Sequence, residues 1–220
     1  MTSTLTDQDN TPSALAYGSF QNGVSVTELA AAYQMFGNGG MYYTPRFYTR
    51  VTDKAGNVLT ERKDAGKQVL DAADAWIMNR LLYYNVSKDD GIALAARLDD
   101  GSEVCGKTGT AGNGSGSDTD RLFVGMTPEY CAAVWIGYDA KNAAIDRLEY
   151  KLPGAVWKQI MEKADRKQTA FTPEESVTAA AFCTETGLLA GGNCPQTEIG
   201  YYRTDNLPQK CTHEQKQNET

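Results

Sequence analysis

The sequence predicts a mixed fold of the α/β (α+β) class, in which an antiparallel sheet of three strands packs with helices and an irregular C-terminal tail follows. Amphipathic helical stretches fill much of the first half of the chain. Three strand-like stretches, 103–110, 121–126 and 130–138, are separated by short turn-forming segments, which indicates a meander. Beyond residue 165 the composition shifts to Thr, Gly, Pro, Gln and Cys. We therefore expect a folded region over 1–165 and a linker with a Cys-containing tail over 166–220.

The N-terminal segment is expected to enter the fold as a loop and then to form a helix. Residues 1–22 are rich in Thr, Asp, Asn and Gln, which favours irregular structure. Ser25 and Glu28 have the spacing of a capping box, and apolar side chains recur at helical spacing from there to Asn38. Two glycines then end the predicted helix.

A surface hairpin and a second helix are expected next. Residues 42–52 read as an extended segment that returns through 58–59 after a polar turn containing glycine. Asp71 is placed to cap a helix that runs to Val86. A short helical piece over 92–98 then leads into the first strand of the meander.

The last predicted helix follows the third strand. It covers 151–163, with Pro153 in its first turn and an apolar side that contains Trp157. We expect that side to pack on the sheet. A small irregular module over 172–213 should follow the linker, before a disordered end.

Composition and charge limit the classes of partner. The chain of 220 residues is 41% hydrophobic and 22% charged, which is typical of a globular protein. Its net charge of −7 argues against nucleic acid or an anionic membrane surface as the main partner. No apolar run reaches the about 18 residues that a membrane span needs, and residues 1–4 do not open a signal peptide. We expect no cofactor.

The stretch 105–110, Cys-Gly-Lys-Thr-Gly-Thr, carries the main candidate site. Because alternate side chains of a strand share a face, Thr108 and Thr110 can present both hydroxyls to one ligand carboxylate. Lys107 points the other way in an ideal strand and adds positive charge. Gly109 leaves room for a substrate backbone, and the Thr110 N–H could then donate to a developing oxyanion. The alternative is an ordinary strand that carries two threonines.

The residues after this motif strengthen the functional interpretation. A small-residue loop leads to Phe123-Val124-Gly125, then to Thr127-Pro128, and then to Val134-Trp135-Ile136-Gly137. This ordered run resembles the end of the transpeptidase domain of class A penicillin-binding proteins. The segment 23–40 resembles a helix of that family, and 182–213 resembles an extension found on many members from Gram-positive bacteria. The resemblance covers roughly residues 5–213.

The resemblance implies a role for each residue of the motif. Lys107 would lie beside the serine of a Ser-x-Asn element and tune proton transfer. Thr108 and Thr110 would hold the terminal carboxylate of the substrate, Gly109 would let it approach, and the Thr110 N–H would complete an oxyanion hole. Lys107 and Thr110 are therefore the expected catalytic residues, with no metal in the site. The implied ligands are peptidoglycan stem peptides and β-lactams.

The nucleophile of that family is missing from this sequence. No serine has Lys three residues later, and none has Asn two residues later. We therefore expect a fragment of a D,D-transpeptidase domain that is inactive alone. Its partner would be an N-terminal part of the same protein, which would also supply export and anchoring at the cell membrane. Cys105 and Leu122 depart from the residues usual in the family, without an expected loss of function.

Two alternatives to that function stay open. A non-catalytic relative, which binds or scaffolds, could have kept this wall and lost the nucleophile. A serine β-lactamase fits less well, because the long tail and the strand that contains Trp135 are more typical of penicillin-binding proteins.

Two further groups of residues could bind a metal. Cys183, Cys194 and Cys211 lie near the only histidine, His213, in the tail. They could form a zinc site or a single disulfide with one free thiol, and the lack of short Cys-x-x-Cys spacings favours the disulfide. The pair Asp118 and Asp120 is better explained as part of a solvated loop, because no third ligand lies nearby.

Overall fold

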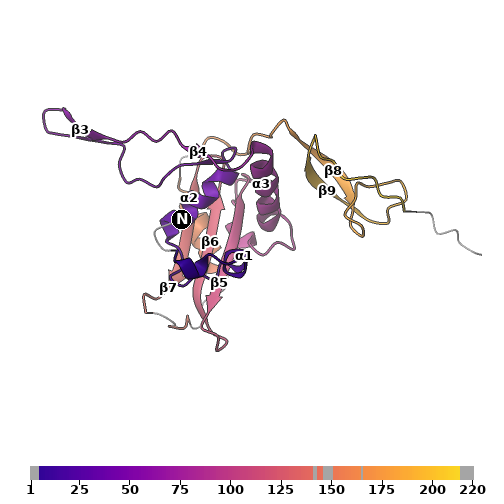
Figure 1. Cartoon of the computed structure of the whole chain (residues 1–220), viewed down its shortest axis with the longest axis horizontal. Helices are drawn as coiled ribbons and strands as arrows, with labels where there is room; N and C mark the ends of the chain where they lie inside the picture. The colour runs from indigo at the N-terminus through magenta and orange to yellow at the C-terminus, as the bar shows by residue number, and fades with distance from the viewer. Residues whose placement is uncertain (1–4, 141–142, 146–150, 165, 214–220) are drawn as a thin grey trace, which may run out of the picture.

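The computed structural model describes residues 5–140, 143–145, 151–164 and 166–213. A three-stranded antiparallel sheet occupies the middle of the molecule, with helices packed around it (Figure 1). Two hairpins project from this body on opposite sides, one formed by β2 and β3 and the other by β8 and β9 (Figure 1). The predicted fold class is confirmed. No helix in these described ranges is long and apolar enough to cross a membrane.

The N-terminal segment is more ordered than the sequence interpretation expected. A 3-10 turn, Asp7–Asp9, and a short helix, α1 (Pro12–Tyr17), replace the loop predicted over 1–22, whose first four residues lie outside the described residues. Thr11 caps the helix by accepting a hydrogen bond from the Ala14 N–H, and Gly18 ends it at a φ of 69°. The prediction was wrong because these capping signals were outweighed by the polar composition.

The next helix follows its capping prediction closely. The Ser25 hydroxyl accepts from the Glu28 N–H, and the Glu28 carboxylate accepts from the Ser25 N–H, at the start of α2 (Val26–Tyr33). The predicted helix continues only as a 3-10 turn, Gln34–Phe36. Gly40 then has a φ of 87°, and a Cβ there would lie 2.2 Å from the Leu70 carbonyl oxygen. Glycine is therefore required at this turn.

Two small antiparallel pairs connect α2 to the next helix. β1 (Met41–Tyr42) pairs with β4 (Lys67–Gln68). β2 (Arg50–Thr52) and β3 (Val58–Glu61) form the predicted surface hairpin, which is exposed along its whole length. The extended segment predicted over 42–52 is thus interrupted between β1 and β2.

The long helix α3 (Ala72–Ser87) begins where the sequence predicts. The Asp71 carboxylate accepts from the Ala73 N–H at its start. A 3-10 turn, Leu94–Ala96, takes the place of the short helical piece expected over 92–98. The chain then enters the first strand of the central sheet.

The meander has the predicted order. β5 (Cys105–Gly112) pairs with β6 (Asp118–Met126), which pairs with β7 (Cys131–Gly137), so β5 and β7 are the two edges. β6 starts at Asp118, within the segment that the sequence interpretation treated as a loop.

The final helix of the body, α4 (Leu152–Met161), packs on this sheet as predicted. Its Trp157 is fully buried and meets the Phe123 ring of β6 edge-on, with ring centroids 5.5 Å apart. Val86 of α3 and Val104 join the same apolar cluster. Burial of these large side chains is the main stabilising contribution to the body.

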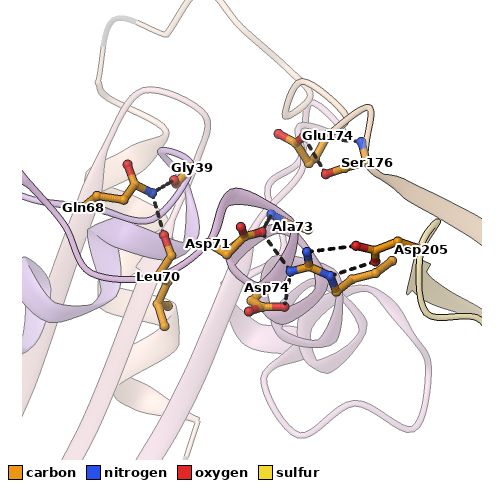
Figure 2. A network of polar contacts seen from close by, with 10 residues as sticks. Gly39, Gln68, Leu70, Asp71, Ala73, Asp74, Glu174, Ser176 and Asp205 are labelled. Atoms are coloured by element: carbon orange, nitrogen blue, oxygen red, sulfur yellow. Dashed lines mark hydrogen bonds and ion pairs between the residues drawn. The ribbon is translucent and has the colours of Figure 1, made fainter.

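The tail is more regular than the sequence interpretation predicted. β8 (Val177–Cys183) and β9 (Thr197–Arg203) form a continuous seven-residue antiparallel ladder. Figure 2 shows Asp71, Asp74 and Asp205 meeting around one guanidinium group, which belongs to Arg203 at the end of β9. This contact holds the hairpin against the start of α3.

Candidate functional site

The four predicted site residues lie together on the edge strand β5. Lys107 and Thr110 are exposed, and Thr108 and Gly109 are half-buried. In the register of the sheet, Lys107 stands opposite Val124 and Thr110 opposite Arg121. The structure therefore presents the motif on an accessible strand.

Two hydrogen bonds show which way the peptide groups of β5 face. The Asn85 side chain on α3 donates to the Gly106 carbonyl oxygen at 2.7 Å, and Lys107 Nζ donates to the Thr108 carbonyl oxygen at 3.0 Å. The carbonyl groups of even-numbered residues therefore point away from β6. Since peptide groups alternate along a strand, the Thr110 N–H is directed to the same free edge.

Asn85 makes a contact with β5 that the sequence interpretation missed. It lies 21 positions before Gly106 in the chain, and only the packing of α3 on β5 brings the two together. Its place beside the apolar residues Leu82 and Val86 is the only local signal, since a polar side chain next to a packing stripe often serves as a specific hydrogen-bond donor.

Two glycines of β5 meet different surroundings. A Cβ on Gly106 would lie 2.5 Å from the Phe123 ring, so the core excludes any side chain there. A Cβ on Gly109 would meet only the Leu122 side chain, at 3.5 Å, which is an ordinary contact. The packing of the folded chain therefore requires glycine at position 106 but not at position 109. At 109 the missing side chain leaves room for the backbone of a ligand.

A partly buried ion pair, with Arg80 buried and Glu103 half-buried, lies behind the start of β5. Arg80 of α3 donates two hydrogen bonds to Glu103, at 2.9 and 3.1 Å, and stacks 4.3 Å from the centre of the Trp76 ring. Burial raises the pKa of Glu103, but the Arg80 guanidinium and the Phe171 N–H outweigh it and hold that pKa below its usual range. The pair links α3 to the segment before β5, and Glu103 also accepts a hydrogen bond from Phe171, which follows α4.

The two body cysteines pack in or against the core, as expected, with Cys105 buried and Cys131 half-buried. Cys105 is fully buried, and burial raises the pKa of its thiol well above the usual range. Burial likewise raises the pKa of Cys131 to about 12. Neither thiol is set up as a nucleophile.

The carboxylates of Asp118 and Asp120 already have protein partners. Asp118 accepts two hydrogen bonds from Arg121, and Asp120 accepts from the Trp135 indole N–H at 2.8 Å and from the Thr119 hydroxyl. They stabilise the start of β6, and nothing in this arrangement directs both carboxylates toward one metal ion.

The tail cysteines and His213 come together at the end of β8. Ligand atoms of Cys183, Cys194, Cys211 and His213 all lie within 4.8 Å of one another, and the three cysteines are free thiols. The disulfide that the spacing favoured is thus not formed in the structure. These are the described residues best suited to hold a metal.

Two cavities lie away from the motif. One of 590 Å³ is bordered by α2 and by the turn that contains Thr127 and Tyr130, and one of 280 Å³ is bordered by Trp76 and Phe171. Neither is lined by Lys107, Thr108 or Thr110. In the part of the chain that the structure describes, the motif therefore lies on an open surface and lines neither of these cavities.

Comparison with known proteins identifies the family. Residues 2–162 match the family described as the penicillin-binding protein transpeptidase domain. Over 160 residues the chain is 40% identical to penicillin-binding protein 1A of Clostridium acetobutylicum, an alignment that covers 72% of this chain and 18% of that protein. The chain belongs to the transpeptidase domain family of class A penicillin-binding proteins.

Other penicillin-binding proteins also match the chain in sequence or in structure. Penicillin-binding protein 2D of Bacillus subtilis is 35% identical over 188 residues, which cover 80% of this chain and 26% of that protein. The crystal structure of penicillin-binding protein 1A from Haemophilus influenzae has a TM-score of 0.72 at 18% identity, covering 91% of this chain and 35% of that chain, and supports the fold.

A relative with a bound antibiotic also matches. The structure of the PonA1 protein from Mycobacterium tuberculosis in complex with penicillin V has a TM-score of 0.62 at 26% identity, covering 78% of this chain and 47% of that chain. The chain spans about a quarter or less of the length of the curated penicillin-binding proteins named above.

Proposed function

We propose that this chain is the C-terminal part of a D,D-transpeptidase domain that cross-links peptidoglycan stem peptides by serine acyl transfer and is acylated by β-lactams. The observation that carries the proposal is the exposed edge strand β5, on which Lys107, Thr108 and Thr110 lie side by side in a family of transpeptidases. An edge strand can pair with an extended peptide substrate through its free backbone groups.

Each residue of this wall has a distinct proposed role. Thr108 and Thr110 bind the terminal carboxylate of the stem peptide, or the carboxylate of a β-lactam, through their hydroxyl groups. The Thr110 N–H donates to the oxyanion that forms when the serine attacks. Lys107 supplies positive charge and tunes proton transfer to and from the serine of the Ser-x-Asn element. Removing one oxyanion donor typically costs roughly 2.7–4 kcal/mol of transition-state stabilisation.

The attacking serine belongs to polypeptide outside these 220 residues, because no serine here has Lys at the third following position. That polypeptide supplies the nucleophile helix, the strands that extend the sheet beyond β7, and the membrane anchor that places the domain outside the cytoplasm. Within the chain we assign 1–165 to the transpeptidase domain and 166–220 to a linker and tail; the boundary residue 165 lies outside the described residues.

Covalent labelling tests this proposal. A labelled penicillin is added to the intact protein that contains this chain, and the labelled peptide is mapped by mass spectrometry. We expect one labelled serine outside the 220 residues and no label on the isolated chain. A label on a serine within the chain, or none on the intact protein, would contradict the proposal.

A non-catalytic relative remains the second candidate, favoured by the missing nucleophile motif alone. Such a protein would bind stem peptides without forming a covalent adduct. The labelling experiment separates the two, because only the transpeptidase forms an acyl-enzyme with penicillin.

A further inference from the structure

Four side chains with metal-binding chemistry meet in the C-terminal tail, apart from the transpeptidase wall. Cys183, Cys194, Cys211 and His213 each offer one ligand atom to the cluster. Cys183 and Cys211 are buried, and Cys194 and His213 are half-buried. Thiolate and imidazole are the ligands that zinc prefers in structural sites, where three cysteines and one histidine form a complete set.

The distances in the cluster fit a tetrahedral ion. Zinc binds sulfur at about 2.3 Å and imidazole nitrogen at about 2.0 Å, so a sulfur and a nitrogen on one ion lie about 3.5 Å apart. In the structure His213 Nδ1 lies 3.5 Å from Cys183 Sγ and 3.0 Å from Cys211 Sγ. All four ligand atoms fall within 4.8 Å of one another. Only a small adjustment is needed for the four atoms to bind one ion.

We propose that Cys183, Cys194, Cys211 and His213 bind one Zn²⁺ ion in a closed, structural site. With four protein ligands, the site has no open position for water or substrate. The ion therefore stabilises the tail and takes no part in acyl transfer.

The histidine is already oriented for this role. His213 Nε2 lies 3.1 Å from a carboxylate oxygen of Glu185, while Nδ1 faces the sulfur atoms. Zinc-binding histidines commonly donate their second N–H to a carboxylate, which fixes the ring and raises the basicity of the ligand nitrogen. Glu185 is therefore the outer partner of the proposed site.

Two of the sulfur atoms also have hydrogen-bond donors. The Gly191 N–H donates to Cys194 Sγ at 3.2 Å, and the Thr186 hydroxyl donates to Cys211 Sγ at 3.4 Å. Outer N–H and O–H groups that contact ligand atoms in this way help to hold the ligands of a metal site in place.

The backbone brings three separate segments to the cluster. The Cys183 N–H donates to the Leu188 carbonyl, and the Cys211 N–H donates to the Leu189 carbonyl, each at 2.8 Å. A Cβ on Gly191 would lie 2.6 Å from the Cys211 carbonyl oxygen, so only glycine lets these segments approach so closely. The chain path therefore places the ligands together before any ion binds.

The tail has little else at its centre. Between residues 172 and 213, all of which the structure describes, Cys183 and Cys211 are the only buried residues. No buried aliphatic or aromatic side chain forms a core in this module. Modules too small to bury such a core commonly depend on a metal ion or on disulfides.

Zinc accounts for this cluster better than a disulfide does. A disulfide would use two of the three cysteines and leave one thiol and an inward-facing imidazole nitrogen without a covalent partner. In the sequence, only the lack of short Cys-x-x-Cys spacings favours the disulfide. In the fold, Cys211 and His213 lie next to each other and the chain turns tightly after Cys183. These two features bring the ligands together without a Cys-x-x-Cys spacing.

Metal analysis of the 220-residue chain tests the proposal. The chain is purified without chelators, and zinc is measured by mass spectrometry of the metal. We expect about one zinc per chain, lost from Cys194→Ser and weakened in His213→Gln. The matched control Cys131→Ser, which alters a half-buried cysteine of the body, should retain one zinc.

A second measurement avoids variants that fail to fold. Cobalt added to the unaltered apo chain should give the absorption bands of tetrahedral thiolate coordination. Zinc should protect Cys183, Cys194 and Cys211 from alkylation until a chelator is added. The proposal is overturned if no zinc or cobalt binds, if the Cys194→Ser variant keeps its zinc, or if a disulfide links two of the three tail cysteines in the protein as purified.

Discussion

The central sheet and the C-terminal hairpin are both antiparallel, but they bury different side chains. β6 carries the fully buried Phe123, which packs against Trp157 of α4. The hairpin β8–β9 has no comparable residue, and its most buried side chain is Cys183. The sheet is therefore stabilised by the burial of apolar surface, whereas we propose that the hairpin depends on the cluster of Cys183, Cys194, Cys211 and His213 and on its contacts with α3.

The substitution with the largest expected effect lies in the body and tests whether the body and the hairpin are stabilised independently. Trp157→Ala should destabilise the body by about 3–5 kcal/mol, because it leaves a cavity against Phe123. Urea unfolding followed by far-UV circular dichroism measures the change. Amide exchange in 177–183 should stay slow under native conditions. Equal loss of protection in the hairpin would show that the two regions form one cooperative unit.

The partly buried ion pair of Arg80 and Glu103 gives the next largest effect. Glu103→Gln should cost about 2–3 kcal/mol at neutral pH, because it leaves the Arg80 charge buried without its counter-ion. The pKa of Glu103 is lowered in the folded state, so its contribution is present above the usual value of 4.5 and is lost as pH falls through the folded value.

Thermal melting between pH 7 and pH 3 checks the sign of that effect. The unaltered chain should lose more stability on acidification than Glu103→Gln does. Glu61→Gln, which removes the exposed partner of Arg50 in the surface hairpin, is the matched control and should follow the unaltered chain. Identical acid profiles for all three proteins would rule out a special contribution from the pair of Arg80 and Glu103.

The two glycines of β5 should respond differently to alanine. Gly106→Ala should destabilise the chain by about 1–3 kcal/mol, since its Cβ overlaps the Phe123 ring. Gly109→Ala should change stability by no more than about 0.5 kcal/mol. In the intact protein, however, Gly109→Ala should slow acylation by penicillin. Unchanged acylation would mean that the glycine serves no ligand.

Docking of the hairpin on α3 gives the smallest expected effect. Arg203→Ala removes the group that joins Asp71 and Asp74 to the end of β9. Exposed ion pairs contribute little to global stability, so the melting temperature of the body should stay nearly constant. Amide exchange in 197–203 should become faster. Exchange as slow as in the unaltered chain would show that other contacts hold the hairpin.

The sequence was most informative where the signal was local. The capping box of Ser25 and Glu28 and the cap at Asp71 located two helices, and the Lys-Thr-Gly-Thr stretch located the strand β5. The sequence was misleading for α1, because the signals that start and end this helix, Thr11, Pro12 and Gly18, lie inside a polar stretch. Polar composition is a weaker predictor than caps for such short helices.

Contacts between distant residues could not be predicted. The hydrogen bond from Asn85 to Gly106 depends on how α3 packs, which no local pattern specifies. The tail ladder was missed because Thr, Gly and Cys in 177–203 gave little apolar alternation. The cysteine count pointed to the cluster, but only the fold shows that His213 joins all three thiols.

The rate of acylation by penicillin in the intact protein tests the central claim most directly. Lys107→Ala and the control Lys54→Ala, in the turn between β2 and β3, are compared with the unaltered protein at equal folded fraction. We predict that Lys107→Ala slows acylation by at least about 100-fold, as expected for removal of a group that acts in proton transfer, and that Lys54→Ala leaves the rate unchanged. Equal rates for all three proteins would contradict the assignment of β5 as a wall of the active site.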